Sequence, residues 1–156
     1  MRRKFYTLFL CAALIVTALA AVRPARATLG EPADSVVSDL KALSAVQSSS
    51  TTYENYTVQQ VETDAVVVRE YVSPSGVVFG VAWNGMTHPD LTQLLGSYFA
   101  EYQLARKQSP RKPGRRSSRV KTDRVIVETW GHMRNLQGRA YAPALIPSGV
   151  TIDEIK

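Results

Sequence analysis

The stretch from residue 53 to residue 85 constrains the fold most, because it contains three strand-like runs joined by very short links. The runs are rich in β-branched and aromatic residues: YENYTVQQV (53–61), AVVVREYV (65–72) and VVFGVAW (77–83). The links between them are too short for a parallel crossover, which needs about a dozen residues or more. This part of the chain is therefore predicted to form an antiparallel meander.

Alternation within the third run predicts how that strand faces its neighbours. Large side chains occupy every second position, at Val77, Phe79, Val81 and Trp83. Successive side chains of a strand point to opposite faces, so these four are expected together on one face. The other face carries smaller residues, on which a helix could lie closely.

One long helix is predicted over residues 89–106. Pro89 suits the first turn of a helix. Leucines and aromatic residues recur in this segment at the helical period, and a stripe of this kind is typical of a helix that packs on a core. The stripe consists of Leu91, Leu94, Leu95, Tyr98, Phe99 and Tyr102. A shorter helix is expected within residues 29–46, where apolar residues also recur at helical spacing.

The remaining segments are predicted to add one or two strands to the sheet. RVIVETW (124–130) is expected to form a fourth strand. GRAYAPALIP (138–147) is interpreted as a broken fifth strand that its prolines exclude from the centre of a sheet. QSSSTT (47–52) is interpreted as a polar linker. The predicted fold class is α+β: a small antiparallel sheet of four to five strands with one long helix packed on it and a short N-terminal helix.

Residues 1–27 have the pattern of a signal peptide. Three basic residues precede a mostly apolar stretch, and Ala-Arg-Ala at 25–27 is the small-residue pattern that a signal peptidase recognises. Cleavage is predicted between Ala27 and Thr28. The product, residues 28–156, would be a single α+β domain that is exported, either periplasmic or secreted. Ala-Leu-Ala at 18–20 is a weaker cleavage pattern, and an uncleaved membrane anchor is the alternative interpretation.

Removal of this leader would change the chemistry of the chain. Cys11 is the only cysteine, so the mature chain would have no disulfide and no thiol nucleophile. Five of the 19 basic residues would be lost but none of the 13 acidic ones, so the net charge would fall from +6 to +1. That small total hides an asymmetry, because residues 28–104 carry −7 and residues 105–156 carry +8.

Most of the positive excess lies between residues 106 and 124, where nine basic residues stand against one acid. Prolines, a glycine and serines predict that residues 106–119 form a mobile loop. One interpretation is weak, salt-sensitive contact with a polyanion such as acidic polysaccharide, lipid head groups or nucleic acid. The alternative is a solvated loop that balances the acidic part of the chain. The candidate contact residues are Arg106, Lys107, Arg111, Lys112, Arg115, Arg116 and Arg119.

Two tryptophans end predicted strands beside turn residues. If both strands present the same end of the sheet, the indoles would form an aromatic rim suited to a sugar or a peptide. The alternative is packing at the edge of the core. The candidate rim residues are Trp83, Asn84, His88, Trp130, His132 and Arg134.

The sequence assigns no catalytic, cofactor-binding or metal-ligating residue. The two histidines lie 44 residues apart, without the closely spaced further ligands of a metal site. Ser73-Pro74-Ser75-Gly76 lacks the glycine pattern of a nucleophile elbow, and turn chemistry explains it. Gly-x-x-x-Gly at 76–80 is not followed by Lys-Ser or Lys-Thr, so a P-loop is excluded. An enzymatic role is therefore uncertain, and a non-enzymatic one is favoured.

Several longer segments resemble a known family. They are LGEPADSV, REYVSPSGVVFGVAWNG, HPDLTQLLGSYFAEY, VETWGHMRNLQGRAYAPALIPSGV and the final IDEI. In order and spacing they resemble DUF2844, a family of exported bacterial proteins of unknown function. The resemblance covers residues 29–104 and 124–154 and implies a secreted or periplasmic bacterial protein. It implies no activity, and it does not extend to residues 106–119.

The leading functional hypothesis is a non-enzymatic exported protein that binds a cell-envelope component or accessory partner. An enzyme that acts on an envelope polymer is the first alternative, and a structural accessory of a secretion or surface system is the second. The expected partner is an anionic envelope polymer or a protein, with no cofactor and no specific nucleic-acid binding. Membrane contact is expected only through the leader before cleavage.

Overall fold

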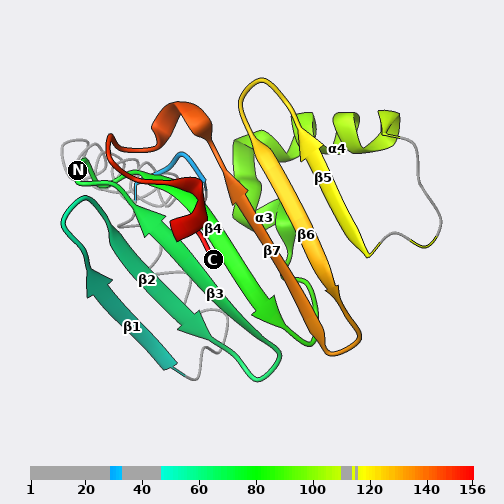
Figure 1. Ribbon diagram of the computed structural model, residues 1–156, viewed down its shortest axis with the longest axis horizontal. Helices are drawn as coiled ribbons and strands as arrows, with labels where there is room; N and C mark the ends of the chain where they lie inside the picture. Colours follow the sequence, from blue (N-terminus) through cyan, green and yellow to red (C-terminus); the bar gives the residue numbers. More distant parts are fainter. Residues whose placement is uncertain (1–28, 33–46, 110–113, 115) are drawn as a thin grey trace, which may run out of the picture.

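The computed structural model of the chain describes residues 29–32, 47–109, 114 and 116–156. Within these ranges the chain forms a seven-stranded antiparallel sheet with the order β1-β2-β3-β4-β7-β6-β5 (Figure 1). The central pair, β4 and β7, joins a meander of β1–β4 to a second meander of β5–β7. The strands are β1 (Gln47–Thr52), β2 (Thr57–Glu62), β3 (Val66–Val72), β4 (Val78–Gly85), β5 (Ser117–Lys121), β6 (Ile126–His132) and β7 (Asn135–Tyr141).

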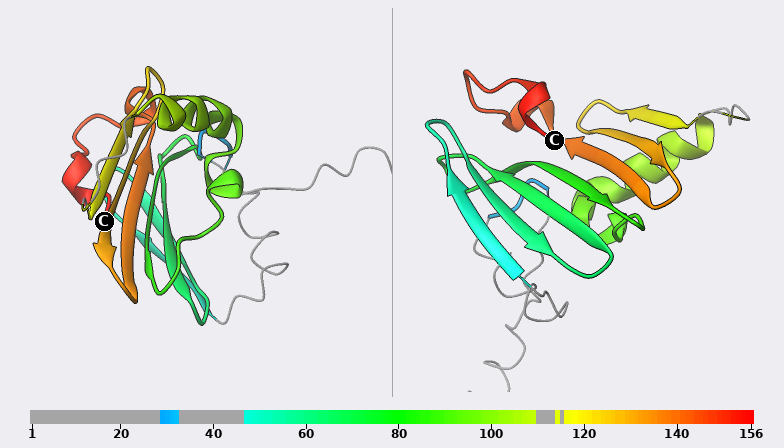
Figure 2. Two further views of the ribbon diagram at one scale, coloured as in Figure 1. Left: turned by 90° about the vertical axis from the view of Figure 1, so that its right-hand side faces the viewer. Right: turned by 60° about the horizontal axis from the view of Figure 1, so that its bottom comes forward.

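A helical stretch between β4 and β5 covers one face of the sheet (Figure 2). It comprises α3 (Leu91–Leu95), the 3-10 turn η2 (Gly96–Tyr98) and α4 (Phe99–Gln108). The carboxylate of Asp90 accepts a 2.8 Å hydrogen bond from the backbone N–H of Thr92, which caps the helix start. The predicted long helix is therefore confirmed, although it begins at Leu91 rather than at Pro89.

The chain after β7 lies on the opposite face of the sheet (Figure 2). It contains two 3-10 turns, η3 (Pro143–Leu145) and η4 (Ile152–Glu154). Among the described residues, two apolar clusters hold these layers together. The helix-side cluster includes Trp83, Leu95 and Val127, and the cluster on the other face is built around Phe79, Tyr141 and Ile155. None of the helices in the described ranges has the length and apolar character of a membrane-spanning helix.

A β-bulge places Phe79 on the face opposite to the one predicted. Tyr71 pairs with Gly80 and Val72 pairs with Val78, so Phe79 is an extra residue on β4. An extra residue interrupts the alternation of a strand. Val81 and Trp83 consequently belong to the helix-side cluster, whereas Phe79 belongs to the other one.

The small-residue face of β4 does not carry the helix, contrary to the prediction. Gly80 lies on that face, and the side chain of Ile155 packs against it, so that a methyl group added at Gly80 would come within 2.9 Å of the Ile155 Cδ1 atom. The helical stretch instead covers the face that carries Val81 and Trp83. The helix therefore packs against large side chains, and the chain after β7 uses the space above the glycine.

The α+β class is confirmed, but the predicted sheet of four to five strands is too small. Residues 47–52 form edge strand β1 rather than a linker. Edge strand β5 begins inside the predicted loop at 106–119, and α4 extends into that loop from the other side. β7 is central because it ends at Tyr141, before the first of the two prolines. The helix expected within residues 29–46 lies outside the described residues, apart from a turn and a bridge at residues 29–32.

Candidate ligand-binding face

The two tryptophans lie at the same end of the sheet but on opposite faces. Trp83 pairs with Gly138 and Trp130 pairs with Gln137, so both sit beside the same part of β7. The Trp83 side chain is buried in the helix-side cluster, at 2 % exposed. Trp130 lies on the other face, where its indole N–H donates a 3.0 Å hydrogen bond to Gln137 Oε1. The structure therefore does not form one rim from the two indoles.

The other predicted rim residues are exposed but scattered. Asn84 is the second-last residue of β4, and His132 and Arg134 lie at the loop between β6 and β7, where Arg134 has φ 64°. His88 is exposed overall, yet its Nδ1 atom accepts a 3.1 Å hydrogen bond from the Trp83 indole. Burial of this edge of the ring, with a smaller contribution from the positive charge of Arg106, lowers the pKa of His88 below its ordinary value.

The predicted polyanion contacts are also divided by the structure. Arg106 and Lys107 lie in the last turn of α4, Arg116 directly precedes β5 and Arg119 lies within it; all four are exposed. Three members of the set lie outside the described residues, as does the predicted cleavage site at Ala27 and Thr28. These three are Arg111, Lys112 and Arg115.

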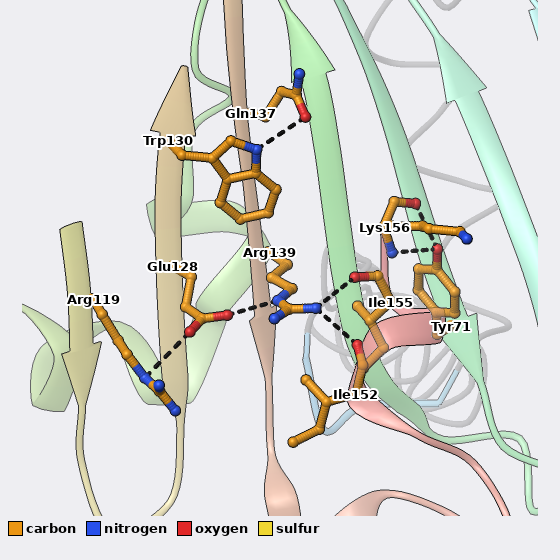
Figure 3. Close-up of polar contacts among 9 residues, drawn as sticks. All are labelled: Tyr71, Arg119, Glu128, Trp130, Gln137, Arg139, Ile152, Ile155 and Lys156. Atoms are coloured by element: carbon orange, nitrogen blue, oxygen red, sulfur yellow. Dashed lines mark hydrogen bonds and ion pairs between the residues drawn. The ribbon is translucent and has the colours of Figure 1, made fainter. Parts of the chain in front are cut away.

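One residue from each predicted set meets at a charge cluster on the face opposite the helix (Figure 3). Glu128 of β6 lies between two arginines: its Oε1 is 3.2 Å from Arg119 Nε, and its Oε2 is 2.6 Å from Arg139 Nε. The Arg139 guanidinium also lies 5.9 Å from the Trp130 ring. The three strands β5, β6 and β7 thus bring Arg119 and Trp130 together through Glu128 and Arg139.

This cluster lines a groove of about 370 Å³, which we call the arginine groove. In its described lining the cations outnumber the single acid, and the neutral side chains on this face are those of Ser117, Trp130 and Ile155. The side chain of Arg119 is 59 % exposed, whereas that of Glu128 is 15 % exposed. The lining residues are Ser117, Ser118, Arg119, Glu128, Thr129, Trp130, Arg139, Ile155 and Lys156.

One wall of the arginine groove is the last segment, residues 151–156, which crosses the middle of the sheet (Figures 1 and 3). Arg139 Nη1 donates to the carbonyls of Ile152 at 2.8 Å and Ile155 at 3.3 Å. The Tyr71 hydroxyl donates to the Lys156 carbonyl at 2.8 Å and accepts from the Lys156 N–H at 3.0 Å. The Arg139 guanidinium is therefore occupied by contacts within the protein, whereas the side chain of Arg119 is largely exposed to solvent.

The buried phenol of Tyr141 lies beside the arginine groove, and its pKa is raised. Tyr141 is 1 % exposed, and burial is the main cause that raises the pKa of its phenol. The negative charge of Glu128 raises that pKa further, while Arg119 and Arg139 oppose the shift. Across the described ranges, no group of three or more His, Cys, Asp or Glu side chains is arranged to hold a metal ion.

Comparison with known families decides where the chain belongs. A family model described as "Protein of unknown function (DUF2844)" matches residues 25–155. The chain belongs to the DUF2844 family. The match spans most of the chain, including every strand of the sheet and nearly all of the arginine groove, but it supplies no activity. No curated protein matches the chain, and no solved structure matches it either.

Of the arginine groove in this DUF2844 protein, sequence reasoning selected only Arg119 and Trp130, and it missed Glu128 and Arg139, which connect them. Both are charged residues inside apolar strands, and they pair directly across the β6–β7 hairpin. The loop at Met133 and Arg134 fixes the register in which β6 and β7 pair, so it is the feature from which this pairing could have been predicted. The loop carries none of the Asn-Gly or Asp-Gly dipeptides that indicate a two-residue turn, so the hairpin was not predicted.

Proposed function

We propose that this DUF2844 protein is an exported, non-enzymatic binding protein whose ligand is a carboxylate-bearing polysaccharide of the cell envelope. The observation that supports the proposal is the exposed guanidinium of Arg119 in a groove whose described lining contains three basic side chains and one acidic side chain. The guanidinium fork matches the planar geometry of a carboxylate. Glu128 lies beside the Nε of Arg119, and Arg119 also hydrogen-bonds to the Tyr141 hydroxyl, yet 59 % of the Arg119 side chain remains exposed to a ligand.

The neutral lining of the groove suits a sugar more than a simple anion. Trp130 offers an apolar ring, and Ser117, which pairs with Trp130 on the same face, offers a hydroxyl group. The Trp130 ring is held in place by its hydrogen bond to Gln137 and by the neighbouring Arg139 guanidinium. A rigid aromatic side chain with polar neighbours is a common way to position a ligand ring.

The groove supports binding over catalysis. Hydrolysis of a glycosidic bond ordinarily requires two carboxyl groups that flank the bond. In the described lining of the arginine groove, Glu128 is the single carboxylate side chain, and two guanidiniums hold it. Glu70 is buried at 3 % exposed but does not line this groove.

Export is supported by the leader pattern and by the extent of the family match. The match begins at residue 25, close to the Ala-Arg-Ala sequence that ends the proposed leader. Mass spectrometry of the protein recovered from cells tests this part of the proposal. A mature chain that begins at Thr28 is expected, and a chain that begins at Met1 would contradict cleavage.

Calorimetric titration with carboxylate-bearing hexasaccharides tests the binding. We expect hexagalacturonate or an alginate hexasaccharide to bind, and the affinity to fall between about 50 mM and about 500 mM salt, because exposed charges are screened. Arg119→Gln should weaken binding by about tenfold, the loss of one charge-assisted hydrogen bond. Arg106→Gln removes the same charge from α4 and should leave binding unchanged.

Three outcomes would overturn this function. The first is that neither hexasaccharide binds at millimolar concentration. The second is that Arg119→Gln and Arg106→Gln weaken binding equally, which would indicate attraction to net charge alone. The third is that single-stranded DNA binds as tightly as the hexasaccharides, because a carboxylate-specific site should not accept a phosphate polymer equally well.

A further inference from the structure

A second hollow lies on the same face of the sheet, on the other side of the last segment. It has a volume of about 530 Å³ and lies over β1, β2 and β3. We call it the tyrosine groove, and its volume falls in the range of small-molecule sites. Its lining residues are Ser49, Thr51, Tyr53, Tyr56, Val58, Gln60, Arg69, Tyr71, Glu154 and Lys156. The strands beneath it are separate from those that build the arginine groove.

The register of the strands arranges this lining in rows. Ser49 pairs with Gln60, and Gln60 pairs with Arg69, which gives one polar row across the three strands. The next row along the strands ends at Tyr71, and beyond it lies the turn that carries Tyr53 and Tyr56. The groove thus has a polar floor at one end and an aromatic wall at the other.

The aromatic wall is fixed before any ligand arrives. Tyr53 stacks on Tyr56 with ring centroids 4.8 Å apart and an interplanar angle of 20°. Tyr56 in turn meets the edge of Phe79 at 6.1 Å, inside the core cluster of this face. Tyr53 remains 51 % exposed, so a large part of a rigid aromatic surface faces solvent. Holding the ring in place lowers the entropy lost when a ligand packs against it.

The polar row is equipped to bind hydroxyl groups. Arg69 Nε donates to Gln60 Oε1 at 3.0 Å, which turns the donor end of the Gln60 amide away from Arg69. Within the part of the chain that the structure describes, the Ser49 hydroxyl makes no hydrogen bond, and neither does the Thr51 hydroxyl. Hydroxyl and amide groups can donate to and accept from sugar hydroxyls without any charge on the ligand.

Two of the three charged side chains that line the tyrosine groove, Arg69 and Glu154, are already engaged, and the charge of the third, Lys156, acts on the Glu154 carboxylate. Arg69 also approaches the Lys156 carbonyl, at 3.4 Å from its Nη1. The Glu154 carboxylate accepts from the backbone N–H and the hydroxyl of Thr151, at 2.8 Å and 3.0 Å. A groove whose flat aromatic surface and hydroxyls are open, while its arginine and its acid are bound within the protein, fits a ligand with apolar ring faces and hydroxyl edges.

We propose that the tyrosine groove binds an uncharged sugar ring, which stacks on Tyr53 and is held at its edge by Ser49 and Gln60. This site is distinct from the arginine groove and does not depend on an anion binding there. The apolar C–H face of the sugar would lie on the phenol ring, and its hydroxyls would meet the polar row. The ligand class is therefore a neutral oligosaccharide.

Saturation-transfer NMR and calorimetry with three neutral hexasaccharides test this site. The probes are cellohexaose, maltohexaose and chitohexaose, each at low and at high salt. We expect at least one to bind, with an affinity that salt does not change, since no ligand charge is involved. Tyr53→Leu keeps an apolar side chain but loses the flat ring, and should weaken binding by about tenfold. Tyr53→Phe keeps the ring and should bind like the unchanged protein.

Two further variants locate the binding in the tyrosine groove. Ser49→Ala removes one exposed hydroxyl on β1 and should weaken binding several-fold even if Tyr53→Leu disturbs the turn. Arg119→Gln alters the arginine groove and should leave neutral-sugar binding unchanged. Failure of all three hexasaccharides at millimolar concentration would overturn the proposal. So would equal binding by Tyr53→Leu and the unchanged protein, or binding of charged saccharides alone.

Discussion

The indole N–H of Trp83 donates a 3.1 Å hydrogen bond to Nδ1 of His88, and the two rings meet nearly edge-on at 82°. This contact joins the buried end of β4 to the loop that leads into α3. It also requires an unprotonated Nδ1, because a protonated nitrogen cannot accept. The hydrogen bond from Trp83 therefore favours the neutral imidazole, in addition to burial and the charge of Arg106, which lower the pKa of His88.

The first prediction concerns pH. The folded protein lowers the pKa of His88, so the unfolded chain binds more protons than the folded one at mildly acidic pH. The stability that the neutral imidazole contributes is present above its ordinary pKa of 6.5, and it is lost as the pH falls through the lower folded value. Thermal unfolding should therefore show a decrease in Tm over that window.

A variant that cannot titrate provides the control for this pH effect. His88→Asn offers an amide oxygen to the Trp83 indole but has no proton to gain, so its Tm should depend less on pH in the same window. Trp83 fluorescence, followed in parallel, should change on acidification in the unchanged protein alone. An identical pH profile for both proteins would rule out His88 as the titrating group.

The second prediction concerns Gly138, which lies under the Trp83 ring. A methyl group at Gly138 would overlap both that ring and the backbone carbonyl of Glu128. Overpacking of this kind destabilises a protein by about 1–3 kcal/mol, and by more where rigid groups cannot move. Gly138→Ala should therefore lower the free energy of unfolding by at least this amount in urea denaturation.

Gly80→Ala is the matched comparison, because both glycines lie in the central strand pair. A methyl group there would meet the Cδ1 atom of Ile155 at 2.9 Å, and that atom ends a side chain that can rotate. The loss of stability should be smaller than for Gly138→Ala. The reverse order would show that Trp83 does not lie across Gly138 as described.

Much of the architecture could be predicted because the relevant signals are local. The β2–β4 meander follows from short links and β-branched runs, and the long helix follows from the periodic stripe that ends at Tyr102. Edge strands β1 and β5 lack that signal. Their sequences, QSSSTT and SSRVK, show little apolar alternation, and they are strands because β2 and β6 offer them backbone partners.

The candidate site was harder to predict because its geometry depends on register. One extra residue in β4 reverses the face of Phe79, and no turn dipeptide marks the β6–β7 loop that brings Glu128 opposite Arg139. Trp83 and Trp130 are at the same end of the sheet, which was the condition for the predicted rim. Only pairing with β7 shows that they occupy opposite faces.

The third prediction concerns the tyrosines at high pH. Burial, together with the hydrogen bond to Glu154, raises the pKa of Tyr56 to about 12, and burial also raises the pKa values of Tyr71 and Tyr141. The stability linked to these phenols is fully present below their ordinary pKa of 10.0 and is lost as the pH rises through the folded values. Phenolate absorbance should therefore show a late-titrating group of three tyrosines in the folded protein. One uniform step near pH 10.0 in the folded protein would contradict this.

The last prediction tests how the last segment is attached. Ile155 and Ile152 lie three residues apart in the same segment, but Ile155 is fully buried and Ile152 is 39 % exposed. Truncation of a fully buried isoleucine costs about 2–5 kcal/mol, so Ile155→Ala should lower the free energy of unfolding by that amount. Ile152→Ala should cost much less, because its backbone carbonyl still accepts from Arg139. Urea denaturation of both variants makes the comparison.

Since the last segment forms a wall of both grooves, Ile155→Ala should also weaken binding in each groove, whereas Ile152→Ala should not. Equal effects of the two substitutions would show that the segment is not anchored through Ile155.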